Sequence, residues 1–104
     1  MLLTDDAAQD LDDLFSYIET HDSLEKAHHV LDQIAETFSS LAENPERGAY
    51  TKELLAIGMR EYREVYFKPY RIIYRIIENH VYVMLIVDGR RDMQSLLQRR
   101  LLQA

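Results

Sequence analysis

Two strand-forming runs in the last third of the chain restrict its fold more than any other feature. Residues 70–77 and residues 81–87 are rich in β-branched and aromatic side chains, and a short polar turn at residues 79–80 separates them. Residues 81–87 are apolar at every position, which is typical of a strand covered on both faces. The pattern predicts a central β-hairpin that delivers the pair Arg90 and Arg91 to the edge of a sheet.

Further elements flank this hairpin on both sides. Residues 59–67 have the composition of a strand and lead into the hairpin through a turn at residues 68–69, which predicts a three-stranded antiparallel meander. Residues 48–58 are expected to form a loop with a short helical turn. After the meander, Asp92 can cap a final helix.

The first half of the chain predicts a helical hairpin. Apolar residues recur at steps of three and four over residues 5–20, and again from a cap at Ser23 to about residue 43. Two helices joined by so short a link are expected to pack antiparallel. Residues 2–3 could add a very short strand before them. The fold class is therefore α+β, with the helical hairpin packed on a small antiparallel sheet in the order β-α-α-β-β-β-α.

Length and composition limit the class of protein. A chain of 104 residues with 47% hydrophobic residues is long enough for one domain with its own core, here spanning 1–104. The absence of cysteine excludes disulfides, thiolate nucleophiles and cysteine-ligated zinc. Because no signal peptide and no long apolar run is present, we expect a cytoplasmic protein that makes no contact with a membrane.

Charge is divided unevenly along the chain. Residues 1–50 carry two basic and twelve acidic side chains, a balance of −10, whereas residues 51–104 carry ten basic and six acidic ones, a balance of +4. The total of −6 argues against strong direct binding of nucleic acid, since phosphate neutralisation supplies most of that affinity. A local basic face could still recognise an acidic partner.

Four blocks of sequence resemble a known family in their order and spacing. Residues 4–11, 41–48, 69–74 and 88–92 are similar to the recurrent blocks of the ParE/RelE superfamily of type II toxin–antitoxin toxins, often labelled plasmid stabilisation proteins. The resemblance spans nearly the whole chain. It implies a growth-inhibiting toxin that a cognate ParD-like antitoxin neutralises.

One branch of the superfamily consists of RelE-like, ribosome-dependent mRNA endonucleases. Arg71 and Arg91 match the arginine positions of that branch, so they would be the catalytic residues of a ribonuclease. Tyr62 and Glu64 stand where lysines would be expected, and residues 96–97, both leucine, occupy the place of the acid/base residue. Without that group a ribonuclease would lose about 100- to 10,000-fold in rate.

The ParE-like branch is implied to act by binding DNA gyrase, with no catalytic residues and no cofactor of its own. Such a function needs a surface with charge for steering and apolar anchors for affinity. The residues expected to form this target-binding face are Arg90, Arg91, Leu97, Arg99, Arg100 and Leu101. Tyr62 and Tyr66 are the expected contacts of the antitoxin. A ribonuclease, or a non-toxic relative that retains antitoxin binding, is the alternative.

Other clusters have simpler explanations. His28 and His29 with Asp32 could bind a metal, but no third kind of ligand is apparent and a solvated surface is favoured. The acidic residues at the start of the first helix are explained by helix-start preference and solvation, so no metal site is expected. The tyrosines of the strands could stack nucleic-acid bases, although packing in a core or groove is favoured.

The arginines also have structural alternatives. Arg71 and Arg75 could pair across the strands with Glu61 or Glu64. The pair Arg90 and Arg91 could form a salt bridge with Asp88 or Asp92 instead of contacting a target.

Overall fold

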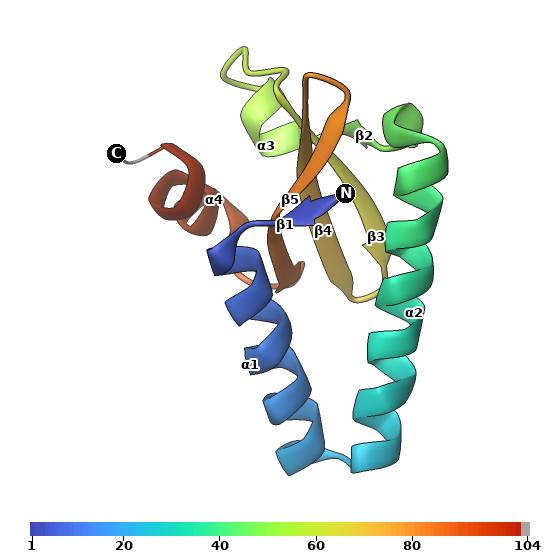
Figure 1. Ribbon diagram of the computed structural model, residues 1–104. Coiled ribbons are helices and arrows are strands. Elements are labelled where there is room, and N and C mark those ends of the chain that lie inside the picture. Colours follow the sequence, from blue (N-terminus) through green and yellow to red (C-terminus); the bar gives the residue numbers. More distant parts are fainter. Residues whose placement is uncertain (103–104) are drawn as a thin grey trace.

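The computed structural model describes residues 1–102. The predicted α+β class is confirmed, and the predicted elements follow in the expected order with one additional short strand, β2. The elements are β1 (Leu2–Leu3), α1 (Asp5–His21), α2 (Leu24–Glu43), a 3₁₀ turn (Pro45–Arg47), β2 (Ala49–Tyr50), α3 (Lys52–Leu55), β3 (Tyr62–Phe67), β4 (Tyr70–Ile77), β5 (His80–Asp88), α4 (Met93–Leu97) and a π-helical turn (Gln98–Leu102). Figure 1 shows the helical hairpin reaching well beyond the sheet.

Two side-chain caps start the hairpin helices. The Thr4 hydroxyl accepts a hydrogen bond from the Ala7 amide at 3.1 Å, and the Ser23 hydroxyl accepts one from the Lys26 amide at 3.0 Å. Each cap satisfies one of the amides that a helix start leaves without a partner. The predicted boundaries of both helices are correct to within a residue, and the helices pack antiparallel as expected.

The sheet has five strands in the order β1-β5-β4-β3-β2. The predicted meander β3-β4-β5 is antiparallel, and β1 pairs with β5 in parallel, so the sheet is mixed. The short β2 forms the opposite edge, on β3. The predicted turn is one residue too late: Glu78 and Asn79 take it, both with positive φ, and His80 already belongs to β5.

A β-bulge at Met84 decides which face each part of β5 presents. Ile73 lies opposite Leu85 and Tyr74 opposite Val83, so Met84 is the extra residue. A bulge of this kind changes the alternation of side chains and interrupts regular pairing. Val81, Val83 and Ile86 therefore belong to one core, and Leu85 and Val87 to the other.

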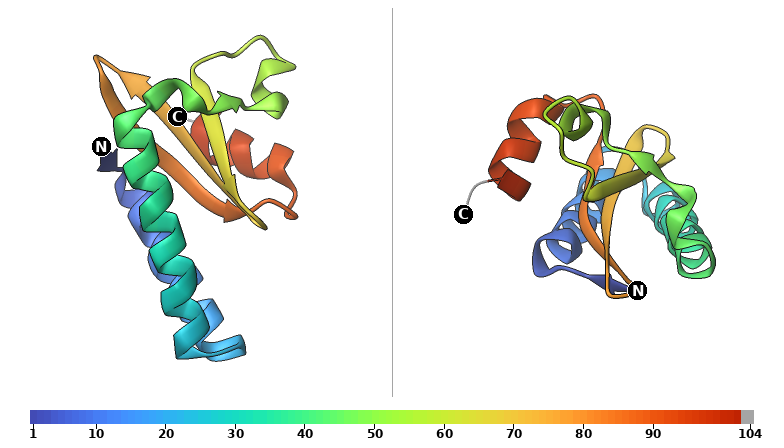
Figure 2. Two further views of the ribbon diagram at one scale, coloured as in Figure 1. Left: turned by 90° about the vertical axis from the view of Figure 1, so that its right-hand side faces the viewer. Right: turned by 90° about the horizontal axis from the view of Figure 1, so that it is seen from above.

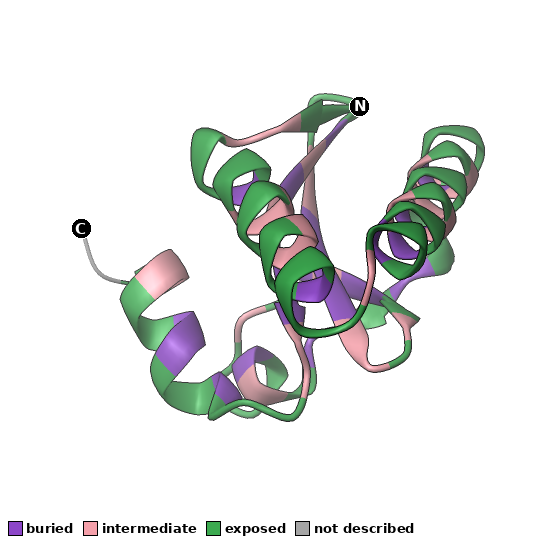
Figure 3. Cartoon of the chain, turned by 90° about the horizontal axis from the view of Figure 1, so that it is seen from below, coloured by how far each residue is buried: buried purple, intermediate pink, exposed green. Residues whose placement is uncertain are grey.

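The sheet is covered on both faces, as the apolar run of β5 predicted. The larger core lies between the sheet and the hairpin α1–α2, and the smaller one lies under α3 and α4. Figure 2 shows these two pairs of helices on opposite sides of the strands. The exposed residues of α1 and α2 face away from the sheet (Figure 3). None of the helices in residues 1–102 has the length and apolarity to cross a membrane.

Tyr74 ties the end of α2 to the centre of the sheet. Its side chain is fully buried, and its hydroxyl donates to the Pro45 carbonyl at 2.6 Å and accepts from the Gly48 amide at 3.0 Å. Gly48 must lack a side chain, because a Cβ there would lie 2.6 Å from the Tyr74 hydroxyl and 2.7 Å from the Glu64 carbonyl. Tyr74 is therefore a core residue, in line with the packing explanation for the tyrosines.

Replacing Tyr74 with phenylalanine should lower the free energy of unfolding by about 1–3 kcal/mol, because a buried amide and a carbonyl lose their partner. Urea denaturation followed by circular dichroism measures this. Tyr82→Phe is the control, since Tyr82 is only partly buried and has no hydrogen bond from its hydroxyl within residues 1–102. An equal loss in the two variants would contradict the role of the Tyr74 hydroxyl.

Candidate functional site

The arginine pair lies where β5 emerges from the sheet. Arg90 is largely exposed, with 78% of its side chain accessible, and its guanidinium pairs with Asp88 at 2.5 Å. The hydrogen bonds from Arg90 hold the pKa of Asp88 below its usual range. The salt bridge to Asp88 that was the alternative prediction for Arg90 is therefore formed. An exposed pair contributes little to stability, so Arg90 can exchange Asp88 for another anion.

A groove of about 460 Å³ adjoins this pair, between α1 and the ends of β4 and β5. Five of its ten lining residues are apolar or aromatic, and the other five are charged, three of them acidic and two basic. Its lining residues are Asp10, Asp13, Leu14, Tyr17, Tyr70, Ile86, Val87, Asp88, Arg90 and Arg91. Tyr17 is 62% exposed at its border. The groove thus combines apolar and aromatic side chains with charged groups of both signs, a combination that can supply anchors and steering for a protein partner.

The C-terminal helix presents less of its surface than predicted. Asp92 caps it as expected, accepting from the Ser95 amide at 3.2 Å. The prediction that Leu97 contacts a target is wrong, because Leu97 is 1% exposed and packs with Leu96 in the core under α4. Leu101 is half-buried against the same core. Arg99 is exposed and remains a candidate for target binding.

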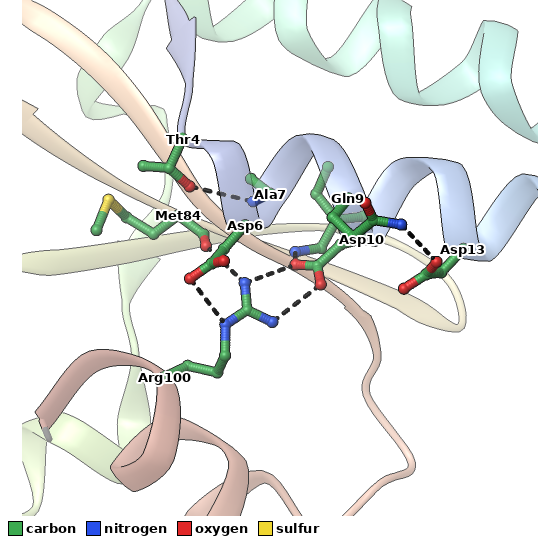
Figure 4. Close-up of polar contacts among 9 residues, drawn as sticks. Thr4, Asp6, Ala7, Gln9, Asp10, Asp13, Met84 and Arg100 are labelled. Atoms are coloured by element: carbon green, nitrogen blue, oxygen red, sulfur yellow. Dashed lines mark hydrogen bonds and ion pairs between the residues drawn. The ribbon is translucent and has the colours of Figure 1, made fainter.

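Arg100 is engaged inside the molecule. Its Nη1 and Nη2 donate to the two carboxylate oxygens of Asp10 at 2.9 and 3.0 Å, and Nη2 also reaches the Met84 carbonyl at 3.3 Å. Figure 4 shows the guanidinium between Asp10 and Asp6 of α1, with its Nε 3.9 Å from Asp6. These contacts raise the pKa of Arg100, chiefly through the hydrogen bonds to Asp10. Arg100 therefore positions the C-terminal segment and is not a free target contact.

Asp10 also closes the edge of the sheet. Its carboxylate accepts a hydrogen bond from the Ile86 amide at 3.1 Å, beyond the point where β1 stops pairing with β5. We name Asp10 and Arg100 the edge clamp, because together they bind the carbonyl of the bulge residue Met84 and the amide of Ile86. This role of Asp10 was not predicted, because the acidic residues at the start of the first helix were expected to be solvated. The available signal was its place beside the apolar stripe, three residues after Ala7 and four before Leu14.

Arg71 lies in a buried ion network. Its side chain is 4% exposed and donates two hydrogen bonds to Glu53 of α3, at 2.7 and 2.8 Å, and one to Glu64 of β3. These bonds raise the pKa of Arg71 and lower that of Glu53. The predicted alternative of cross-strand pairing with Glu64 is therefore correct. A phosphate group could not reach this guanidinium without opening the network.

The two tyrosines predicted to bind an antitoxin differ in their exposure. Tyr62 is 6% exposed in the core under α4, with the Arg75 guanidinium 5.8 Å from its ring, so the prediction that it forms a docking surface is wrong. Tyr66 is 54% exposed and remains a candidate. The nearby carboxylate of Glu64 raises the pKa of the Tyr66 hydroxyl.

Within residues 1–102, no group of three or more histidine, cysteine, aspartate or glutamate side chains is arranged to hold a metal ion. His28 packs edge to face on Phe15, with ring centroids 5.3 Å apart.

Fold and site together define a class of protein. It is a small α+β protein in which a helical hairpin and a short C-terminal helix cover opposite faces of an antiparallel meander, and an arginine pair borders a groove at the strand exit. The chain belongs to the family described as ParE toxin of type II toxin-antitoxin system, parDE, whose sequence model matches residues 1–93. Leu97, Arg99, Arg100 and Leu101 lie outside the matched range.

A solved structure has a similar fold. A chain from the "Chromosomal ParDE TA system from P. aeruginosa" superposes with a TM-score of 0.69 and 20% sequence identity, over 84% of this chain and 91% of that chain. At this identity the likeness supports the fold. No curated protein sequence matches this chain.

Proposed function

We propose that this chain inhibits growth by binding DNA gyrase, and that a ParD-like antitoxin neutralises it. Membership of the ParE toxin family supports a toxin that acts within a parDE pair. The observation that carries the mode of action is the groove at the strand exit, where exposed Arg90 and Arg91 stand beside an apolar lining. Such a surface can bind a protein target without any chemical step.

The ribonuclease alternative has less support. Of its two expected arginines, Arg71 is engaged by two carboxylates in the interior, and only Arg91 is accessible. Tyr70 lines the groove, but burial raises the pKa of its hydroxyl away from neutrality. A general acid or base works best with a pKa near the working pH, so Tyr70 is poorly suited to replace the missing proton-transfer group.

Antitoxin binding follows from the family description, and one exposed side chain offers a place for it. Tyr66 presents most of its ring to solvent on the face that bears α3 and α4. An aromatic side chain of this kind supplies contact area at a low entropic cost. Antitoxin binding by this chain without any growth inhibition would identify it as the non-toxic relative that is the remaining alternative.

Reversing the exposed charge at the strand exit is expected to abolish growth inhibition. The variant replaces Arg90, Arg91 and Arg99 with glutamate and leaves the edge clamp intact. The physical reason is that an acidic groove would repel the anionic surface that the arginines attract. Colony formation after induction measures the effect, and circular dichroism checks that the variant folds.

The matched control carries the same change of charge elsewhere. Lys26, Arg47 and Lys68 are exposed and lie outside the groove, so their replacement by glutamate should leave growth inhibition unchanged. Equal loss in both triple variants would mean that net charge, and not this face, matters. Undiminished inhibition by the first variant would remove the assignment.

The target is tested with purified components. We expect the protein to stabilise the cleaved-DNA complex in a gyrase assay and to leave mRNA intact on translating ribosomes. Cleaved mRNA together with unaffected gyrase would replace the proposal with the ribonuclease alternative.

A further inference from the structure

Two charged side chains of the groove at the strand exit have no ionic partner. Asp10 and Asp88, which also line it, are already paired with arginines of this chain. Asp13 on α1 and Arg91 beyond the end of β5 form no ion pair within residues 1–102. The groove therefore keeps one anion and one cation for a ligand, and they come from the two elements that border it.

Asp13 is held in one orientation and remains accessible. The side-chain amide of Gln9 donates to Asp13 Oδ1 at 2.8 Å from one turn back along α1 (Figure 4). Tyr17 stands one turn further along the same helix, is 62% exposed, and stacks its ring on His21 with centroids 4.1 Å apart. A carboxylate beside an exposed aromatic ring is suited to a basic side chain, which both groups attract.

Apolar side chains accompany the two charges in the lining. Leu14 and Tyr70 are half-buried, and Ile86 and Val87 are almost fully buried. A partner that covers these side chains also removes water from around Asp13. Because charges that lose water interact more strongly, the sign of the partner's charge on each side of the groove decides whether it binds.

A partner that carries acidic side chains alone fits only half of the groove. Its carboxylates would pair with Arg91 but would bring a like charge toward Asp13, which opposes binding. A partner with a basic side chain on the α1 side and an acidic one on the β5 side satisfies both. Asp13 thus rejects partners that the arginines alone would accept.

We propose that the gyrase segment held in the groove carries a basic side chain that pairs with Asp13, an acidic side chain that pairs with Arg91, and an apolar side chain between them. The inference rests on the proposed function, because it takes gyrase as the partner at this site. It adds the chemistry of the bound segment, and it makes Asp13 a contact that determines specificity.

The test changes the sign of Asp13 alone. Asp13→Lys makes the chain more basic, so attraction of an acidic surface by the arginines would leave gyrase binding unchanged or strengthen it. With the proposed segment, two cations would face each other, and we expect the affinity for purified gyrase to fall about tenfold. Surface plasmon resonance on immobilised gyrase measures the affinity, and colony formation after induction should show weaker growth inhibition.

A second variant and a matched control complete the design. Asp13→Asn removes the charge and keeps the shape and the acceptor for Gln9, so its affinity should fall less, by about threefold. Asp12→Lys makes the same change of net charge as Asp13→Lys. Because Asp12 is exposed on the same helix but does not line the groove, this control should retain the affinity of the unaltered chain. Circular dichroism checks that all three variants fold.

The possible failures are distinguishable. If the unaltered chain binds gyrase and Asp13→Lys binds it as tightly or more tightly, this inference is overturned and the proposed target stands. Equal losses in Asp13→Lys and Asp12→Lys would attribute the effect to net charge and would overturn it too. A loss of antitoxin binding in Asp13→Lys, with gyrase binding unchanged, would assign Asp13 to the antitoxin instead. No gyrase binding by the unaltered chain would remove the proposed target together with this inference.

Discussion

Replacing Arg71 with methionine is expected to lower the free energy of unfolding by about 3–5 kcal/mol at neutral pH. The change keeps much of the side chain's apolar volume but removes the only charged partner shown for Glu53 and Glu64 within residues 1–102. Glu64 is 4% exposed, so its carboxylate would remain buried without a cation. Urea denaturation at pH 7 measures the loss. Arg90→Met is the control, and it should change stability little, because Arg90 is exposed.

The pH dependence of stability gives a second readout for the same network. Hydrogen bonds from Arg71 lower the pKa of Glu53 below its ordinary value of 4.5. The stability that Glu53 contributes is therefore complete above that value and is lost as the pH falls through the lowered pKa. In the Arg71→Met variant this contribution should disappear, so its stability should fall less between pH 6 and pH 3. Parallel stability curves for the variant and the unaltered chain would contradict the role of the network.

The elements of the fold could be predicted because each has a local signal. The caps at Thr4 and Ser23, the helical period of the hairpin and the apolar run of β5 are all visible in the chain itself, and the structure agrees with them. β2 was not predicted, because Ala49 and Tyr50 lie within a stretch expected to be a loop and their pairing with β3 depends on tertiary contacts. The bulge at Met84 also has no signal in the sequence, since every position around it is apolar.

The candidate site was predicted less well, and burial explains the difference. Sequence could mark Arg90 and Arg91 as a pair at a strand exit, but periodicity did not separate Leu97 from the exposed residues of a short helix. Arg71 and Arg100 form salt bridges with carboxylates on distant elements, whereas Arg99, with the same side chain, is exposed. Such pairings join residues up to ninety positions apart, which no local pattern reports.

Removing Asp10 is the second change with a large expected effect, because it opens the edge clamp. Asp10→Ala removes the only acceptor shown for the Ile86 amide within residues 1–102 and the two shortest hydrogen bonds of the Arg100 guanidinium, whose side chain is only 19% exposed. We expect a loss of about 2–3 kcal/mol in the free energy of unfolding. Amide hydrogen exchange should also accelerate over residues 93–97, because the clamp holds the C-terminal segment against α1.

This change should also weaken growth inhibition, although Asp10 itself carries no positive charge. The reason is that Arg99 lies on the segment that the clamp holds, so its position relative to the groove depends on Asp10. Asp12→Ala is the matched control, since Asp12 is exposed on the same helix and should alter neither exchange nor toxicity. Combining Asp10→Ala with Arg100→Ala should cost less than the sum of the two single changes, because both break the same Asp10–Arg100 pair. Fully additive losses of stability would show that the two side chains act independently. Growth inhibition retained in a folded Asp10→Ala variant would place the inhibitory surface on β5 and the groove, and not on the C-terminal segment.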